Sequence, residues 1–224
     1  DEILIDEVQD LSAYDWDIVD ALLGSAVDLW MVGDIRQAVL STNARSAKNK
    51  KYAYAEAINW FRSREKKGLL AIEESAVSWR CHPKIAAFSD TIFDPSWAFP
   101  STVSKNDHTT GHDGVFLVRS EHVHAYLAQY GPQSLRHSVA SAKNLALDFM
   151  NFKVSKGATF PRVLIAPTST ITNFVRGGVS MDAIAASSFY VAVTRAQQSV
   201  AIVLDDPGMS RLPYWKPAAD LERD

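Results

Sequence analysis

The sequence predicts an α/β protein built from parallel sheets with flanking helices, and three observations support this class. Short apolar runs at Ile3–Ile5 and Leu29–Val32 are typical of the buried strands of a parallel sheet. The residues between the two runs follow a helical period. From residue 114 onward, strand-like and helix-like segments alternate again, which indicates a second α/β unit.

The first unit begins with a strand, a helix and a second strand. The apolar residues between the two runs fall at helical spacing, at Trp16, Val19, Leu22 and Leu23. Ser12 with Asp15 three residues later indicates the start of this helix, and Gly24 marks its expected end. Three such elements within about thirty residues form a βαβ unit, so we expect two parallel and fully buried strands.

The rest of the chain adds a helix, a loop and the second alternation. His82-Pro83 is expected to open a helix that runs to Phe93, because proline is favoured in a first helical turn. Residues 94–113 are predicted to form a loop. The expected strands are 114–118, 163–166 and 200–204, and the expected helices are 123–130, closed by Gly131, and 181–196. Residues 146–152 fit a strand or a helix, and we favour a strand.

Composition limits the classes of protein that this chain can represent. Of its 224 residues, 47% are apolar and 22% are charged, which is typical of a globular protein. No apolar stretch approaches the roughly twenty residues of a membrane span, so no membrane partner is expected. The single cysteine, Cys81, excludes an internal disulfide and fits a reducing compartment, so we expect a cytoplasmic protein. A net charge of −3 does not indicate a nucleic-acid binder, and such binding would need a local basic patch.

Acidic residues follow both strands of the first unit. Asp6-Glu7 and Gly33-Asp34 come at the ends of strands that we expect to be neighbours, so they should meet at the carboxyl edge of the sheet, where ligands bind. Two adjacent acids suit a division of roles, in which one holds Mg²⁺ and the other accepts a proton from an attacking water. Gln37 lies just beyond, where its amide can orient water or contact a phosphate. The alternative is that these acids only cap the ends of strands.

Three further segments supply cationic side chains and a turn. SWRCHP (78–83) places Arg80 before a helix, and FYVAVTRAQQSVAIVLD (189–205) places Arg195 late in a helix and before a strand. SKGATFPRVLI (155–165) is a Lys-Gly turn that leads into a strand. An arginine that faces a nucleotide stabilises the charge that develops on a transferred phosphoryl group.

In chain order, the segments DEVQD, GDIRQA, SWRCHP, SKGATF and YVAVTRA resemble motifs II to VI of the UvrD/Rep/PcrA-like superfamily 1 DNA helicases. The resemblance implies RecA-like parallel sheets of the P-loop NTPase type. Residues 1–75 would be the C-terminal part of helicase lobe 1A, and residues 76–224 a nearly complete lobe 2A. In this family ATP binds between two RecA-like lobes, and its hydrolysis drives movement along single-stranded DNA.

The resemblance also assigns roles to individual residues. Asp6 would bind Mg²⁺, Glu7 would be the general base that activates water, and Gln37 would sense the γ-phosphate of ATP. Arg80 and Arg195 would reach the same phosphate from the second lobe. ATP and Mg²⁺ are therefore the cofactors that the resemblance implies.

Motif V and the stretch after motif III depart from the family pattern. Leu40 and Thr42 stand where the family has aromatic residues that stack on bases, Lys153 stands in place of a histidine, and Thr159 in place of a glutamate. Lysine favours a phosphate backbone more than a neutral imidazole does. Gly157 of this motif is expected among the nucleotide-binding residues. The expected DNA-contacting residues are Lys153, Lys156, Thr42, Lys50 and Lys51. The interval between motifs IV and V is too short for the accessory domain 2B of UvrD and Rep.

Some features leave alternatives open. The basic stretch 45–67 contains four aromatic residues, so it is either a solvated face or a surface that contacts single-stranded DNA. The histidines lack the paired spacing of a zinc site, so no metal site is expected at His108, His112, His122 or His124. No G-x-S-x-G segment anchors a hydrolase triad, and a nucleophilic role for Cys81 is not expected.

A nucleoside-triphosphate site needs a loop of backbone N–H groups and a lysine, and the G-x-x-x-x-G-K-S/T pattern of that loop does not occur in the 224 residues. We therefore expect the chain to be the C-terminal part of a longer helicase-like protein and to hydrolyse no ATP alone. Its expected partners are single-stranded DNA, the N-terminal half of the same protein, and a nuclease or a DNA repair protein. The alternative is a non-enzymatic helicase-like module that binds DNA or a nuclease.

Overall fold

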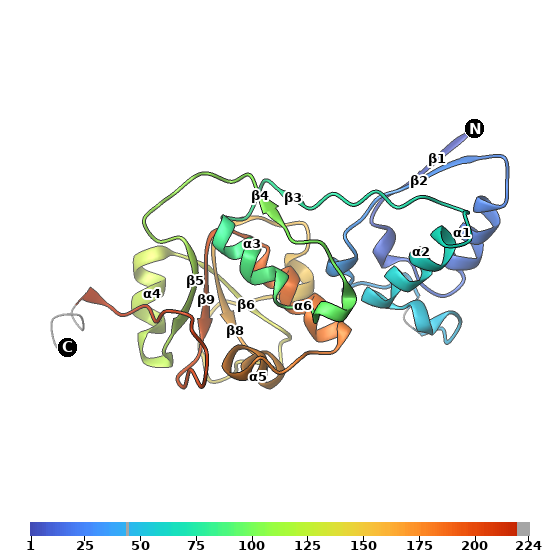
Figure 1. Ribbon diagram of the computed structural model, residues 1–224. Coiled ribbons are helices and arrows are strands. Elements are labelled where there is room, and N and C mark those ends of the chain that lie inside the picture. Colours follow the sequence, from blue (N-terminus) through green and yellow to red (C-terminus); the bar gives the residue numbers. More distant parts are fainter. Residues whose placement is uncertain (44, 219–224) are drawn as a thin grey trace. The chain divides into compact units, whose positions relative to one another are not determined.

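Two compact units make up the structure, a computed structural model that describes residues 1–43 and 45–218 (Figure 1). The first unit is Asp1–Ser75 and the second is Ala76–Asp224. Each unit carries parallel strands flanked by helices, which confirms the predicted α/β class. Every pairing between the named strands of the described residues is parallel.

The first unit contains the predicted strand–helix–strand segment. β1 (Glu2–Ile5) pairs in parallel with β2 (Asp28–Met31), and α1 (Asp15–Leu23) connects the two strands. Gly24 caps the end of α1, as expected. α2 (Ala57–Glu65) follows a long segment of turns and short 3₁₀ helices.

One face of this sheet packs on the core of the unit and the other is exposed, so the prediction of two fully buried strands is wrong. Trp16 of α1 and Trp60 of α2 are buried, with ring centroids 4.7 Å apart, and Met31 packs against their cluster. On the other face Leu4 is 69% exposed and Trp30 is 60% exposed. Because both helices contribute to one core, alternate residues of each strand point into that core and away from it.

Two aromatic residues of the basic stretch belong to the core of the first unit. Trp60 and Phe61 are buried, and Phe61 packs edge-on against Trp60 at 5.1 Å between ring centroids. Tyr52 lies beside Arg64, whose guanidinium is 5.6 Å from the ring centroid and forms an ion pair with Asp20 at 2.6 Å. Trp60 and Phe61 therefore cannot offer their rings to a nucleic acid in this structure, because α2 turns them into the core.

A five-stranded parallel sheet forms the centre of the second unit (Figure 1). In spatial order its strands are β5 (Gly114–Val118), β9 (Ala196–Val203), β8 (Phe160–Ala166), β6 (Gln133–Arg136) and β7 (Met150–Asn151). A separate parallel pair joins β3 (Val77–Ser78) to β4 (Val103–Ser104). β9 and the second half of β8, from Val163 to Ala166, are buried, which agrees with the apolar runs in their sequences.

Helices cover both faces of this sheet (Figure 1). α4 (Val123–Tyr130) connects β5 to β6, whereas α5 (Ser169–Gly177) and α6 (Ala183–Val193) connect β8 to β9 in the opposite direction along the sheet. Because such connections are right-handed, opposite directions place the helices on opposite faces. α3 (Pro83–Asp90) packs against α6, β5 and β9.

Two helices end earlier than the sequence indicated. α3 stops at Asp90 rather than Phe93, because the Asp90 carboxylate accepts hydrogen bonds from the Thr102 backbone N–H and hydroxyl, both at 2.7 Å. The predicted helix 181–196 is α6, which ends at Val193, and Ala196 already belongs to β9. α6 starts after Asp182. The carboxylate of Asp182 caps it by accepting from the N–H groups of Ile184 and Ala185.

β6 and α5 were not expected from the sequence. β6 is four residues long and reads Gln-Ser-Leu-Arg, so it has no apolar run. α5 is rich in β-branched residues, which lower helix propensity, but it is capped by Thr168 and ends at Gly178 in the left-handed conformation. Of residues 146–152, only the pair of β7 is a strand, so the strand assignment holds for two residues.

An aromatic stack accounts for one of the histidines. His112 lies between the rings of Phe116 and Tyr130, at 4.1 and 3.9 Å between ring centroids, and its Nε2 is 2.9 Å from the hydroxyl of Tyr126. Burial lowers the pKa of His112 to about 4, so the imidazole is neutral at neutral pH. Among the residues that the structure describes, no cluster of three or more histidine, cysteine or acidic side chains is arranged to hold a metal ion. None of the helices in the described part of the chain has the length and apolar character of a membrane span.

Candidate functional site

The acidic residues that follow β1 and β2 lie at the same edge of the sheet in the first unit. The N–H of Val32 donates to the carbonyl of Ile5 at 2.9 Å, and the N–H of Val8 donates to the carbonyl of Val32 at 3.1 Å. These two hydrogen bonds continue the parallel pairing beyond the strands. They bring the segments that contain Asp6-Glu7 and Asp34 side by side at the carboxyl edge, which is where open parallel sheets bind ligands.

Glu7 has a left-handed backbone conformation, with φ 51° and ψ 41°. This conformation is uncommon for residues other than glycine and costs about 1–3 kcal/mol. Two hydrogen bonds fix it: the Glu7 N–H donates to Asp6 Oδ1 at 2.8 Å, and the Asp10 N–H donates to the Glu7 carbonyl at 2.9 Å. The turn leaves both Asp6 and Glu7 exposed at the edge.

Asp34 and Gln37 form the second half of this edge. Asp34 caps a 3₁₀ turn over Ile35–Gln37 by accepting from the Arg36 N–H at 3.0 Å. Its other carboxylate oxygen accepts from the Gln37 side-chain amide at 2.8 Å. Ala38 directly after the turn is fully buried and anchors it. The structure therefore brings Gln37 to the same carboxyl edge as Asp6 and Glu7, through Asp34.

Thr42 lies in a network of small polar side chains. Its N–H donates to the carbonyl of Asp10 at 3.0 Å, and its hydroxyl contacts the Ser12 hydroxyl at 2.9 Å and the carboxylate of Asp15. Lys50 and Lys51 are exposed on the following segment. Thr42 is thus tied to the start of α1, and the two lysines supply local positive charge at a separate segment of the same unit.

Arg80 and Arg195 converge on Thr194 in the second unit. Arg80 Nη1 donates to the carbonyl oxygen of Thr194 at 3.3 Å, and Arg195 Nη2 donates to its hydroxyl at 3.3 Å. Arg195 is only 1% exposed, and it also donates to the carbonyls of Val191 at 3.1 Å and Ala158 at 3.3 Å. The arginines predicted from separate motifs are therefore brought together, although Arg195 is buried.

The segment of motif V joins this arrangement through its backbone. Gly157 has a φ of 83°, which favours glycine, in the turn between a 3₁₀ helix over Phe152–Ser155 and β8. The next residue, Ala158, supplies the carbonyl that Arg195 contacts. Lys153 is exposed and Lys156 is half-buried. Gly157 is therefore near the arginines, whereas Lys153 presents its charge to solvent.

Cys81 is a structural thiol in this region. Its sulfur lies 3.5 Å from the carbonyl of Thr194, the oxygen that Arg80 also contacts. Burial raises the pKa of the Cys81 thiol, although Arg80 and Arg195 nearby oppose that effect. A raised pKa leaves little thiolate at neutral pH, and only the thiolate is a good nucleophile. Cys81 is therefore unsuited to nucleophilic catalysis.

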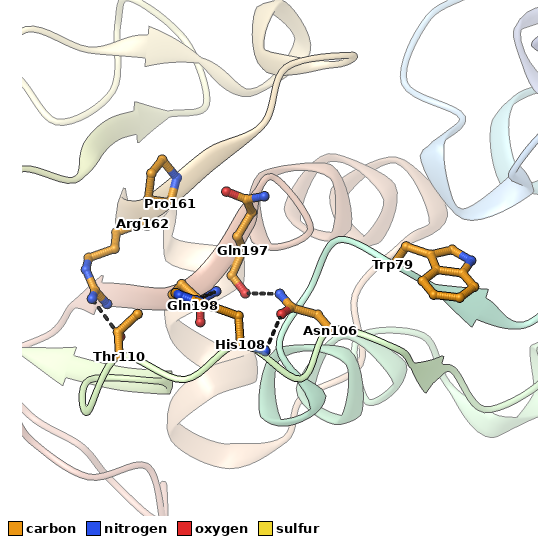
Figure 2. A pocket seen from close by; sticks show the side chains of 8 residues that line it. All are labelled: Trp79, Asn106, His108, Thr110, Pro161, Arg162, Gln197 and Gln198. Carbon is orange, nitrogen blue, oxygen red and sulfur yellow. Dashed lines mark hydrogen bonds between the residues drawn. The ribbon is translucent and has the colours of Figure 1, made fainter.

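A pocket of about 340 Å³ opens beside Arg80, and Figure 2 shows the side chains that line it. Trp79 stands at one end and is 77% exposed, and Arg162 stands at the other. Asn106 forms part of the wall and donates to the backbone carbonyl of Arg80 at 2.7 Å. Trp79 was not predicted to be a site residue, although in the segment SWRCHP it directly precedes the candidate Arg80.

Both parts have chemistry that suits a phosphorylated ligand. Carboxylates that stand at a sheet edge suit a hydrated Mg²⁺ ion, which typically uses one or two protein carboxylates together with substrate phosphates. Guanidinium groups suit phosphate oxygens. A pocket with an exposed indole and several amide side chains suits a flat heteroaromatic group, because the ring stacks and the amides donate and accept hydrogen bonds.

A comparison with protein families finds a match within the first unit. Residues 1–57 match the family model of the UvrD/REP helicase N-terminal domain. This match covers both strands, Asp6, Glu7, Asp34 and Gln37. No curated protein matches the sequence at a significant level.

Solved helicase structures resemble the chain along most of its length. The PRRSV helicase is 18% identical with a TM-score of 0.52, and the alignment covers 92% of this chain and 35% of that protein. Arterivirus nonstructural protein 10, a helicase solved in complex with DNA, is 19% identical with a TM-score of 0.53, and the alignment covers 91% of this chain and 40% of that protein. The chain thus spans well under half the length of these helicases. At such identities the likeness is one of fold, and the family match itself is confined to residues 1–57.

Proposed function

We propose that this chain is part of an ATP-dependent helicase or translocase that moves along single-stranded DNA. The observation that carries the proposal is the carboxyl edge of the first unit, which carries Asp6, Glu7 and Gln37 on two neighbouring segments. The match of residues 1–57 to a helicase domain supports it, and so does the helicase-like fold of the chain. The proposed roles of the site residues are those of a nucleoside-triphosphate hydrolase.

The residues at this edge fit Mg²⁺ and a general base. Asp6 is exposed and uses one carboxylate oxygen for the N–H of Glu7, which orients the group without burying it. It is the proposed protein ligand of Mg²⁺, an ion that would neutralise charge on the phosphates. Glu7, one residue further, is the proposed acceptor of a proton from the attacking water. Gln37 is held by Asp34 and is proposed to contact the terminal phosphate.

Arg80, Arg195 and the turn of Gly157 are the proposed cationic and backbone contacts of the nucleotide. Guanidinium groups stabilise the charge that develops on a transferred phosphoryl group. The Arg195 guanidinium is bonded to the carbonyls of Val191 and Ala158 in this structure, so its proposed phosphate contact requires an exchange of partners. Arg80 is less buried and makes one such bond, to Thr194.

The proposed contacts with DNA rest on exposed lysines. Lys153 of motif V and Lys50 and Lys51 of the first unit are exposed and suit phosphate oxygens, and Lys156 is half-buried. Thr42 is the other candidate, although its hydroxyl is already engaged. An arterivirus helicase of similar fold was solved with DNA, which supports a nucleic-acid partner for this chain as well.

The second candidate function is a helicase-like module that binds DNA or a nuclease without hydrolysing ATP. The burial of Arg195 favours this candidate. Its guanidinium donates to three protein groups, and these bonds can explain the arginine by a structural role, without a phosphate ligand. The set of Asp6, Glu7 and Gln37 favours the motor, because a binding scaffold has no need of a general base beside a Mg²⁺ ligand.

A comparison of the 224-residue chain with the intact protein tests the proposal. The chain holds no G-x-x-x-x-G-K-S/T loop, so we expect it to hydrolyse no ATP above background, with or without single-stranded DNA. The intact protein is expected to hydrolyse ATP faster when single-stranded DNA is added. DNA-stimulated hydrolysis by the 224 residues alone would contradict the need for a phosphate loop. An intact protein that binds DNA but hydrolyses no ATP would favour the scaffold.

Trp79 is proposed to stack on the base of the bound nucleotide. Replacement by alanine is expected to raise KM for ATP by roughly 5- to 100-fold, since base–aromatic stacking contributes about 1–3 kcal/mol. kcat should change little, because the base is remote from the reacting phosphate. Phenylalanine at the same position should restore most of the affinity. Steady-state ATPase assays of the intact protein give both constants, and an unchanged KM in Trp79→Ala would remove Trp79 from the site.

A further inference from the structure

Gln9 is a buried polar residue directly beside the proposed general base. It lies in a 3₁₀ turn over Val8–Asp10 and is 1% exposed. Its side-chain amide donates a hydrogen bond to a carboxylate oxygen of Glu7. Burial of a glutamine is unusual unless its amide has a partner, and here the partner is an exposed acid at the sheet edge.

Gly33 leaves the space that the Gln9 side chain occupies. A Cβ atom built on Gly33 would overlap Gln9 Oε1 and would lie 3.1 Å from both Val8 Cγ1 and Val8 N. Gly33 does not have a positive φ, so glycine is required for space rather than for backbone conformation. Gln9 Oε1 has no hydrogen-bond donor among the described residues, and it faces the Cα of Gly33. The end of β2 therefore forms a wall that holds the Gln9 amide in one place.

The backbone and the side chain of Glu7 are fixed by different contacts. The left-handed turn is set by Asp6 Oδ1 and by the N–H of Asp10. These contacts leave the direction of the Glu7 carboxylate open, because a glutamate has three side-chain torsions. The amide of Gln9 contacts the Glu7 carboxylate directly and restrains that direction.

We propose that Gln9 is a positioning residue that aims the Glu7 carboxylate at the attacking water, an inference that rests on the proposed function. In the reaction, the water oxygen forms a bond to the γ-phosphorus, and the bond from this phosphorus to the β–γ bridging oxygen breaks. The electron pair of the broken bond leaves with ADP, and the proton of the water passes to Glu7. Gln9 touches neither water nor phosphate, and it acts by restricting Glu7 to the orientation that accepts the proton. Gly33 acts in turn by leaving room for Gln9.

The test uses Gln9→Met in the intact protein. Methionine keeps the length and volume of glutamine, and it removes both the amide donor and the unpartnered buried oxygen. We expect kcat for ATP hydrolysis to fall by roughly 10- to 100-fold, the loss typical of a group that orients a reactive side chain. KM for ATP should stay close to that of the unmodified protein.

Two further variants separate positioning from a structural role. Gly33→Ala keeps both Gln9 and Glu7. Its added Cβ would displace the Gln9 amide by steric overlap, so this variant should also lower kcat. Gln133→Met is the matched control. Gln133 is a half-buried glutamine of β6 whose amide donates to the carbonyl of Ser134, and its replacement should leave kcat and KM unchanged.

The outcomes distinguish this inference from the function on which it rests. If the unmodified intact protein hydrolyses no ATP, the proposed function fails and the role of Gln9 fails with it. If it hydrolyses ATP and Gln9→Met retains full kcat, only the positioning role is overturned. A Gln9→Met protein with lower kcat and a lower unfolding free energy also overturns it, because that pattern indicates a structural role. A lower kcat, an unchanged KM and an undiminished unfolding free energy support it.

Discussion

Replacement of Glu7 by glutamine is expected to lower kcat for ATP hydrolysis in the intact protein by roughly 100- to 10,000-fold, the usual contribution of a general base. Glutamine has almost the same shape as glutamate and can still accept the hydrogen bond of Gln9, but its amide cannot take a proton from water. Binding of ATP and Mg²⁺ should be retained, because Asp6 rather than Glu7 is the proposed metal ligand. Single-turnover and steady-state ATPase assays measure the loss, and equilibrium binding of a labelled nucleotide measures what is retained.

Glu2→Gln provides the matched control for this result. Glu2 is an exposed glutamate at the start of the same strand, β1, so its replacement makes the same change of charge at the other end of the strand. It should leave kcat unchanged. A Glu7→Gln protein that hydrolyses ATP at the rate of the Glu2→Gln protein would exclude Glu7 as the general base.

The meeting of Asp6-Glu7 with Gly33-Asp34 could be predicted because it follows from one rule. Parallel neighbouring strands end at the same edge of a sheet, and the apolar runs gave both the strands and their ends. The pairing of Val32 with Ile5 and Val8 in the structure has this register. Arg80 and Arg195 were chosen from motif resemblance instead, and no periodicity in the sequence indicated that both would contact Thr194.

The role of Gln9 and the burial of Trp60 could not be predicted in the same way. The Gln9 amide reaches Glu7 only because Glu7 adopts a left-handed turn, and a backbone angle of a single residue leaves no periodic signal in a sequence. Trp60 stands in a segment dense in Lys and Arg, which resembles a DNA-binding surface, yet its orientation depends on which face of α2 packs on Trp16. Neither feature could be predicted because both depend on the direction of a side chain, which is set by tertiary contacts.

Arg195→Ala is expected to lower the free energy of unfolding of the 224-residue chain by roughly 2–4 kcal/mol. The replacement removes the guanidinium donor of the carbonyls of Val191 and Ala158, and loss of a hydrogen bond to a charged group costs about 1.5–3 kcal/mol. It also leaves a cavity where a large buried side chain was. Urea unfolding followed by circular dichroism measures the change, and the chain needs no nucleotide for this measurement.

Two control variants show whether the loss of stability is specific to the buried guanidinium: Arg195→Lys keeps the charge, and Arg176→Ala removes an arginine at the surface. Lysine keeps the charge but has no planar fork of donors, so it should restore only part of the lost stability. Arg176 forms an ion pair with Asp206 at the surface, and its replacement should cost less than about 1 kcal/mol.

The two measurements on Arg195 together decide between the motor and the scaffold. If Arg195→Lys recovers part of the stability that Arg195→Ala loses but recovers no ATPase activity in the intact protein, Arg195 has a role beyond the fold, as a motor requires. If stability and ATPase activity fall and recover together, the bonds to Val191 and Ala158 account for the effect of Arg195, and no contact with phosphate is needed. An unchanged unfolding free energy in Arg195→Ala would mean that these hydrogen bonds contribute nothing measurable to stability. That result would contradict the structural role that the bonds of Arg195, including the one to the Thr194 hydroxyl, indicate.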